Sequence, residues 1–268
     1  MGYLFDPDNW EWLTTGNNAQ FVFEGFLVNI QIALIAMVLS LIVGLVLALA
    51  RLGRNRLITG AVGVWIDIWR NVPLLLLILY VYLAMPQPWK ETWENLAPGF
   101  LSDVLQDGSV FAALIALVLY NSAVLAEIMR AGILSLDRGQ NEAAVALGLT
   151  YWQRMRIVIL PQGLRRMLPA TVSQLITLNK DTTLVSIIAI QEVMRHGRIL
   201  TGQNFFGGVQ APILQVFLFI GALFIVTNLA LSRLSHSLEI REQERTGTTV
   251  EPVTGLEDQV VIAQARDS

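Results

Sequence analysis

Five long apolar segments dominate the hydrophobic pattern of this 268-residue chain. We place them at residues 26–50, 57–84, 110–130, 167–190 and 211–233. The first contains 25 residues without a charge, enough for a helix to cross a hydrocarbon core about 30 Å thick. A large soluble helical protein would need amphipathic stripes, whereas the first and fifth segments are apolar on every side. The pattern therefore predicts an all-α integral membrane protein with five transmembrane helices.

The distribution of Lys and Arg predicts the orientation of these helices. Of the 18 basic residues, 13 lie in the loops at 51–56 and 130–166 and in the C-terminal tail. The remaining loops hold three, and Arg70 and Lys180 lie inside apolar segments; Arg130 and Arg233, at the ends of their segments, are counted with the loop and the tail. Because cytoplasmic loops carry the excess of basic residues, we expect the N-terminus outside and the C-terminus in the cytoplasm.

The apolar segments divide the chain into three parts. Residues 1–25 form an external N-terminal segment that lacks the basic stretch of a cleaved signal peptide. Residues 26–236 form the five-span domain, which includes an external loop at 85–109 rich in Trp, Pro and acids. Residues 237–268 form a polar cytoplasmic tail, which begins with a helical extension through EIREQER and is disordered after it.

The composition excludes several classes of function. Charged residues make up 15% of the chain, against roughly 25% in ordinary soluble proteins. The absence of cysteine, and the wide separation of His196 and His236, argue against a metal site. The basic residues form no dense patch for nucleic acid. The chain has no P-loop sequence and no catalytic Ser-His-Asp set, so its energy source is a gradient or a partner.

The loop between the third and fourth segments predicts two short helices. Asp137 or Asn141 caps the first, and Gly148 ends it. Thr150 caps the second, which stops before Pro161. The first helix presents small exposed side chains, namely Glu142, Ala143, Ala144 and Ala146. Periodicity alone leaves two interpretations open: a helix that docks into a groove of another protein, or an ordinary linker on the membrane surface.

The residues of this loop resemble the EAA loop of the permease subunits of ABC importers. That pattern is Glu-Ala-Ala, three residues, Gly, nine residues, and Ile-x-Leu-Pro. The residues that match it here are Glu142, Ala143, Ala144, Gly148, Leu160 and Pro161, whereas Val158 stands at the Ile position. Three further strings, YNSAVLAEIMRAGILSLDRGQNEAA, WIDIWRNVPLLL and NKDTTLVSII, are similar to the polar amino-acid permeases of the His/Glu/Gln/Arg type. The resemblance extends from about residue 25 to 236.

The resemblance implies an ABC importer type I permease fold in a bacterial inner membrane. It implies four kinds of partner: an ATP-binding subunit dimer, a second permease (itself or a related sister), an extracytoplasmic amino-acid-binding protein, and membrane lipid. The chain itself would bind no cofactor and be no enzyme, since ATP and Mg²⁺ belong to the ATPase. Residues 137–161 would form the coupling loop, with Glu142, Ala143, Ala144, Gly148 and Pro161 as its main residues.

The substrate implied by the resemblance is a polar amino acid. Overall similarity favours glutamate, glutamine or aspartate over arginine or histidine. The alternative is a gradient-driven secondary amino-acid transporter. Such transporters usually have ten or more spans with inverted repeats, whereas this chain has five apolar segments and no clear repeat.

Charged residues inside the second and fourth segments are candidates for the substrate site, because charge in a bilayer core is costly. At 1.5 Å per residue, Asp67, Arg70 and Asp181 lie about 15, 20 and 21 Å from the cytoplasmic ends of their segments. Pro73 favours a kink beside them. By resemblance, the substrate residues would be Asp67, Arg70, Asn179, Lys180, Asp181, Thr182 and Thr183.

These side chains admit a second interpretation. Helical geometry puts Asn179, Thr182 and Thr183 on one face of the fourth segment and Asp181 near the opposite face. Two arrangements are then open. Either one face lines a path and the other packs on neighbouring helices, or the segment is partly unwound. The charged residues could instead pair as structural ion pairs, Lys180 and Arg70 with Asp181 and Asp67. Glu127 and Arg130 at the end of the third segment have the spacing of an i,i+3 ion pair, and the resemblance gives them a structural or gating role.

Overall fold

The computed structural model of the chain describes residues 6–53, 55–202 and 212–246, with side chains to residue 242. Its elements are η1 (Pro7–Leu13), α2 (Asn18–Arg51), α3 (Arg56–Asn71), α4 (Leu74–Ala84), α5 (Gln87–Leu96), α6 (Asp103–Gln106), α7 (Gly108–Leu134), α8 (Arg138–Ala146), α9 (Tyr151–Arg154), the π-helix η2 (Met155–Ile159), α10 (Leu160–Asp181), the 3₁₀-helix η3 (Thr182–Ile188), α11 (Val193–Gly202) and α12 (Ile213–Thr246). The described part of the chain contains no β-strand.

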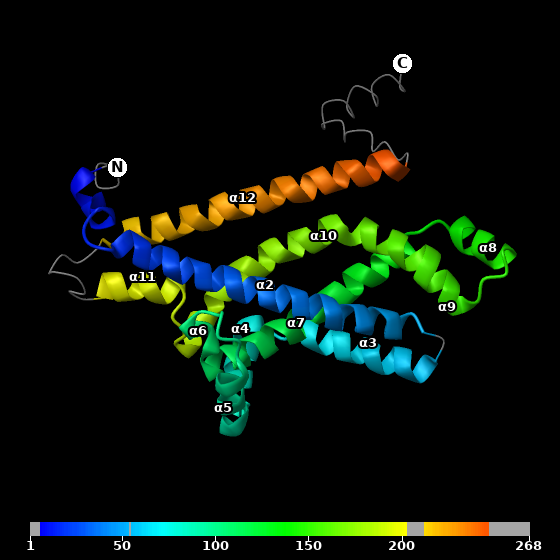
Figure 1. The fold of residues 1–268 in the computed structure, drawn as a ribbon, viewed down its shortest axis with the longest axis horizontal. Coiled ribbons are helices and arrows are strands. Elements are labelled where there is room, and N and C mark those ends of the chain that lie inside the picture. Colours follow the sequence, from blue (N-terminus) through cyan, green and yellow to red (C-terminus); the bar gives the residue numbers. More distant parts are fainter. Residues whose placement is uncertain (1–5, 54, 203–211, 247–268) are drawn as a thin grey trace, which may run out of the picture.

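Four long helices, α2, α7, α10 and α12, run along the length of the molecule (Figure 1). The main packing partner of α2 is α7, and α10 packs on both α7 and α12. The α2–α3 turn and helices α8 and α9 lie at one end, whereas η1 and α11 lie at the other (Figure 1). The structure thus brings the loops at 51–56 and 130–166 to the same end, as the charge distribution predicts.

The length and hydropathy of the helices support only part of the predicted span count. Among the described residues, three helices are long and apolar enough to cross a membrane, namely α2, α7 and residues 213–242 of α12, or four if α3 and α4 form one broken span. Helix α10, which carries Arg165, Arg166, Lys180 and Asp181, is not among them. The count of five spans therefore stays a prediction.

The predicted kink at Pro73 is confirmed as a sharp break. Helix α3 ends at Asn71, α4 begins at Leu74, and their axes differ by 103°. Val72 and Pro73 have extended ψ angles of 129° and 123°. The ring of Pro73 disfavours helical geometry at the preceding residue. The break lets α4 turn away and pack against α7 and η3.

The prediction that the second cytoplasmic helix stops before Pro161 is wrong. Helix α9 continues through η2 directly into α10, where Pro161 lies at the start. The amide of Leu160 donates to the carbonyl of Met155, an i→i+5 bond. A π-turn rearranges the hydrogen-bonding pattern next to the proline, so the missing N–H of Pro161 does not end the helix. Residues 151–188 therefore form one continuous helical rod, from α9 through η3.

The predicted boundary of the C-terminal tail falls inside a helix. Helix α12 continues to Thr246, which agrees with the expected helical extension through EIREQER. The rest of the predicted tail, residues 247–268, lies outside the described residues. The external loop at 85–109 contains α5 and α6, and Trp93 of α5 stacks on Phe111 of α7 with ring centroids 5.1 Å apart.

Candidate functional site

Helix α8 is shaped by local capping interactions at both of its ends. The Asp137 carboxylate accepts a hydrogen bond from the Gly139 amide at 2.8 Å and so caps the start. At the other end Gly148 has a φ of +74°, and the Leu149 amide donates to the Ala144 carbonyl at 3.1 Å. A left-handed residue in this position commonly ends a helix and favours glycine. Asp137, rather than Asn141, is therefore the cap.

The turn after α8 is fixed by a capping box at α9. The Thr150 hydroxyl accepts from the Gln153 amide, and the Gln153 side chain accepts from the Thr150 amide. Arg154 then donates to the Asn141 side chain at 3.0 Å, which ties α9 back to α8. The predicted helix–turn–helix is confirmed, and its caps make it a defined projection at this end of the molecule.

The exposed surface of this projection is more apolar than the sequence suggests. Glu142 and Ala143 are exposed as predicted, but Ala144 is only 2% exposed, so the prediction for that residue is wrong. Leu147 and Trp152, by contrast, are 80% and 73% exposed. Exposed large apolar side chains on a well-capped helix are typical of a protein docking surface.

A charged cluster joins the ends of α2 and α7 close to this projection. Glu127 forms the predicted i,i+3 ion pair with Arg130 at 2.8 Å and a second ion pair with Arg51 at 3.1 Å. The α9 residue Tyr151 donates a hydrogen bond to the Leu52 carbonyl at 3.5 Å. The cluster therefore links α2, α7 and the start of the rod at one end of the bundle.

Two of the predicted substrate residues are buried in helix packing. Asn179 is 1% exposed and donates to Asn228 of α12 at 3.1 Å. Thr182 is fully buried and accepts from Asn29 of α2 at 3.0 Å. Gln174, five residues before Asn179, donates to the buried Asn121 of α7 at 2.8 Å. These side chains join α10 to three neighbouring helices, and polar residues often hold membrane helices together in this way.

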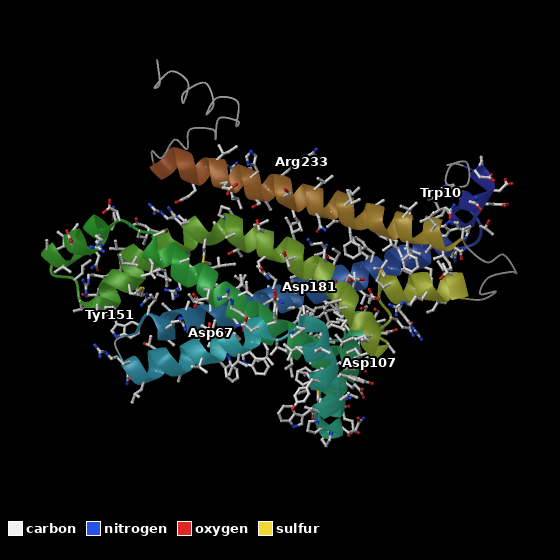
Figure 2. The ribbon with its side chains drawn as sticks, turned by 180° about the vertical axis from the view of Figure 1, so that it is seen from behind. Trp10, Asp67, Asp107, Tyr151, Asp181 and Arg233 are labelled. Carbon is white, nitrogen blue, oxygen red and sulfur yellow. The ribbon has the colours of Figure 1, made fainter. Side chains whose placement is uncertain are left out.

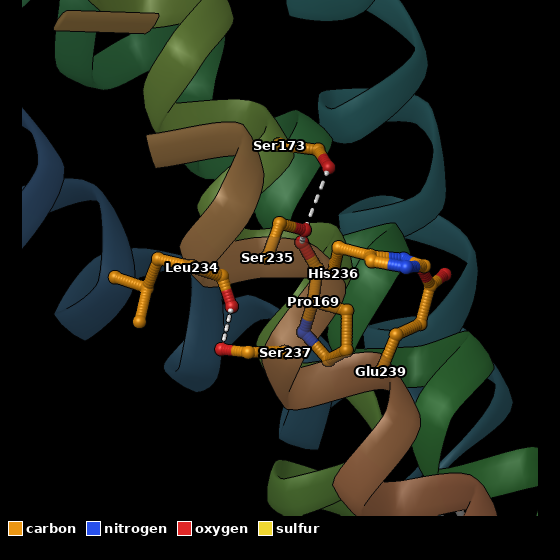
Figure 3. Close-up of polar contacts among 7 residues, drawn as sticks. All are labelled: Pro169, Ser173, Leu234, Ser235, His236, Ser237 and Glu239. Carbon is orange, nitrogen blue, oxygen red and sulfur yellow. Dashed lines mark hydrogen bonds and ion pairs between the residues drawn. The ribbon is translucent and has the colours of Figure 1, made fainter. Parts of the chain in front are cut away.

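A further polar contact lies between α10 and α12 (Figure 3). The Ser235 hydroxyl donates to the Pro169 carbonyl at 3.0 Å, and the hydroxyls of Ser235 and Ser173 lie 3.4 Å apart. Ser235 is 8% exposed. Together with Gln174 and Asn179, these contacts hydrogen-bond the second half of α10 to α7 and α12.

The other predicted substrate residues lie on open surfaces. Asp67, Arg70 and Lys180 are exposed, while Asp181 is partly exposed. Thr183 is also partly exposed and donates to the Lys180 carbonyl at 2.8 Å. Within the described part of the chain, no ion pair joins any of these charged residues. Figure 2 shows Asp67 on α3, closer to the α8–α9 end than Asp181, so the two carboxylates do not meet in this chain alone.

A buried network at the opposite end of the rod was not predicted from the sequence. Glu192, which is fully buried, accepts from Asn29 of α2 at 3.0 Å and from the amides of Met194 and Arg195 at 3.0 and 2.9 Å. Asn29 in turn accepts from the Val193 amide at 3.0 Å. The Glu192 carboxylate therefore caps α11 and holds it against α2.

The titration of two groups in this region follows from their burial. Burial raises the pKa of the Glu192 carboxyl, and the donated hydrogen bonds and the charge of Arg198 lower it in part. Burial lowers the pKa of His196, opposed by its contact with the Phe21 carbonyl at 2.6 Å and by the charge of Glu24. Both groups lie just beyond the fourth predicted span.

Buried uncharged amides are the class of residue that the sequence reasoning missed. Asn29 and Asn121 each interrupt an apolar segment, and both are fully buried. A search for amides within apolar segments would have found them, because an amide in a bilayer core needs a partner. Arg51 was counted as a loop charge, and nothing in its local sequence indicates its pairing with Glu127.

The comparisons with known proteins agree with this architecture. Residues 15–241 match the family described as binding-protein-dependent transport system inner membrane component. The probable glutamine ABC transporter permease protein GlnP of Bacillus subtilis is 35% identical over 222 residues, which cover 83% of this chain and 94% of that protein. The glutamate/aspartate import permease protein GltK of Escherichia coli O6:H1 is 30% identical over 236 residues, covering 86% and 97%.

A solved structure extends the agreement to three dimensions. A crystal structure of an amino acid ABC transporter with histidines has a TM-score of 0.69 and 27% identity to this chain, covering 86% of this chain and 98% of that one. The predicted type I permease fold and inner-membrane location are thereby confirmed. Because the family match spans most of its length, the chain belongs to the family of binding-protein-dependent transport system inner membrane components.

Proposed function

We propose that this chain is the membrane-spanning permease subunit of an ATP-driven importer of polar amino acids. The observation that carries the proposal is α8: an exposed, doubly capped helix with the EAA pattern, in a chain of this family. Leu147 at the end of α8 and Trp152 on α9, both exposed, would enter a cleft of a separate ATP-binding subunit dimer. ATP and Mg²⁺ would be used by that partner, and this chain would transmit its closure.

The rod from α9 to η3 supports this coupling role. It connects the proposed docking surface to the buried network around Asn29 and Glu192 without an interruption of the helix. A rigid element contacted at both ends can pass a displacement from one to the other. The charge distribution would place α8 in the cytoplasm and Glu192 on the outer side.

The substrate path would run along the exposed polar residues, between this chain and a second permease. Asp67 and Asp181 would contact the α-amino group, and Arg70, Lys180 and Thr183 would contact the carboxylate or side chain of the amino acid. Asn179 and Thr182, which are buried and hydrogen-bonded, would position the helix that carries them. An extracytoplasmic binding protein would deliver the substrate.

The relatives favour glutamine, glutamate or aspartate as substrate, since those amino acids appear in the names of GlnP and GltK. The test is reconstitution of the chain with its ATPase and binding protein in liposomes, followed by uptake of labelled glutamine against a panel of competing amino acids. We expect uptake to need ATP and loaded binding protein. Uptake driven by an ion gradient without ATP would overturn the proposal and favour a secondary transporter.

A further inference from the structure

A groove of about 630 Å³ lies at the α8–α9 end of the bundle. Of the residues that line it, only Asp67 also belongs to the substrate path proposed above. The groove is lined by Arg51 at the end of α2, Gly53 in the α2–α3 turn, Arg130 on α7, and Arg56, Gly60 and Val64 on α3. The α3 residues follow one another at helical spacing, so the groove extends along one face of α3.

The charges of this groove favour an anion near its mouth. Arg51 and Arg130 share the single carboxylate of Glu127, at 3.1 and 2.8 Å. Arg56 is exposed, and its side chain makes no ion pair or hydrogen bond with any residue the structure describes. Asp67 is at the far end, eleven residues from Arg56 on α3, or about 16 Å along the helix. An anionic group would therefore bind next to the arginines and away from Asp67.

The space and the surface beside the arginines fit an amphiphile rather than a small ion. A Cβ atom at Gly60 would meet no atom within 4 Å, so the groove is open there, whereas at Gly63 the Arg51 guanidinium lies against the backbone. Leu57 and Val64 on α3 are 84% and 61% exposed. An arginine cluster beside exposed apolar side chains can contact a phosphate and an acyl chain together.

We propose that this groove binds an anionic phospholipid, whose phosphate contacts Arg56, Arg51 and Arg130 and whose acyl chain covers Val64 and Leu57. In the orientation proposed above, the lipid comes from the cytoplasmic leaflet, where anionic headgroups are attracted to basic pockets between membrane helices. The bound lipid would fill the space at Gly60 and hold α3 against α2 and α7.

The test uses the assembled transporter in nanodiscs of phosphatidylcholine with and without phosphatidylglycerol. Lipid retained after detergent extraction is counted by native mass spectrometry, and thermal unfolding is followed in parallel. We expect phosphatidylglycerol to be retained and to raise the unfolding temperature. Arg56→Gln should weaken its binding about five-fold, the effect of one basic residue near an anionic surface. Gly60→Leu should fill the groove and remove the lipid.

Two matched variants serve as controls: Arg241→Gln removes an exposed arginine at the end of α12, and Gly221→Leu fills an equally open glycine site on α12. Both should retain the lipid as the unchanged chain does. Inorganic phosphate and glycerol phosphate are added as soluble competitors. The proposal would be overturned if Arg56→Gln and Gly60→Leu retained as much lipid as the unchanged chain. It would also be overturned if inorganic phosphate displaced the lipid. Because binding is measured without transport, the result is independent of the proposed function.

Discussion

The two ends of the rod formed by residues 151–188 are held in opposite ways. At the α9 end, caps within a few residues of one another fix the local fold, as with Thr150 and Gln153, and a 3.5 Å hydrogen bond from Tyr151 reaches the Leu52 carbonyl after α2. At the η3 end, the contacts join residues far apart in the sequence, as with Thr182 and Asn29. The first end projects exposed apolar side chains, whereas the second has its polar groups buried.

This difference indicates which end can move without breaking the fold. Local caps survive when a helix shifts as a unit, because the partners move together. A buried network between α2, η3 and α11 cannot shift without leaving a polar group unpaired, and this costs about 1–3 kcal/mol per group. We infer that the α8–α9 end is suited to contact a moving partner. We also infer that the Asn29–Glu192 network determines when the outer end responds to a displacement of the α8–α9 end.

The largest expected effect comes from removal of Asn29. Asn29→Leu deprives Glu192 and the Val193 amide of a buried partner. We expect destabilisation of about 3 kcal/mol, measured as thermal unfolding in detergent. Ser40→Ala is the matched control, because Ser40 is a fully buried α2 residue whose hydroxyl has no partner among the described residues. An equal loss in both variants would show that the η3 end is not held by this network.

The next effect concerns coupling at Gly148. Gly148→Asp should lower uptake about ten-fold or more while membrane insertion persists, because burying an unpaired carboxylate in an interface costs about 2 kcal/mol or more. Gly148→Asn is the matched variant, since both residues tolerate a positive φ and nothing lies within 4 Å of the added Cβ. Uptake and membrane content are measured for both. Equal losses would assign the effect to the backbone, and normal uptake by the Asp variant would refute the coupling role.

The contrast between the two ends also explains what the sequence could predict. Gly148 and Thr150 were placed correctly, and Asp137 was one of the two caps proposed for the start of α8, because a cap depends on neighbours a few residues away. The kink at Pro73 is equally local. The pairing of Asn29 with Glu192 spans 163 residues, and no local pattern specifies it. Periodicity likewise indicated that the fourth segment has two polar faces, but only the fold shows that Asn179 and Thr182 on one face are buried, whereas Asp181 on the other is partly exposed.

A smaller effect should appear in the pH dependence of stability. Burial raises the pKa of Glu192 in the folded protein above its ordinary value of 4.5. Between these two pKa values the folded state holds more protons than the unfolded state, so stability falls as pH rises above 4.5 and levels off above the folded pKa. The limiting slope for one group is about 1.4 kcal/mol per pH unit.

Glu192→Gln should abolish this decline. The contribution of His196, which has the opposite sign because burial lowers its pKa, is present in both proteins and cancels in their difference. Thermal unfolding across the pH range measures that difference. Parallel stability curves for the two proteins would mean that Glu192 does not titrate differently on folding.

The smallest effect separates the two interpretations of the charges in the fourth segment. Asp181 is partly exposed and makes no ion pair with the described residues, so Asp181→Asn should change stability by no more than about 0.5 kcal/mol. If the carboxylate contacts the substrate ammonium, uptake should fall about five-fold, equivalent to about 1 kcal/mol for a partly exposed charge pair. Glu239 is an exposed carboxylate on α12, so the control variant Glu239→Gln should leave uptake unchanged.

Unchanged uptake and unchanged substrate-stimulated ATP hydrolysis in Asp181→Asn, together with lower stability, would make Asp181 a structural residue. The substrate contacts would then have to come from Asp67 and Arg70 on α3.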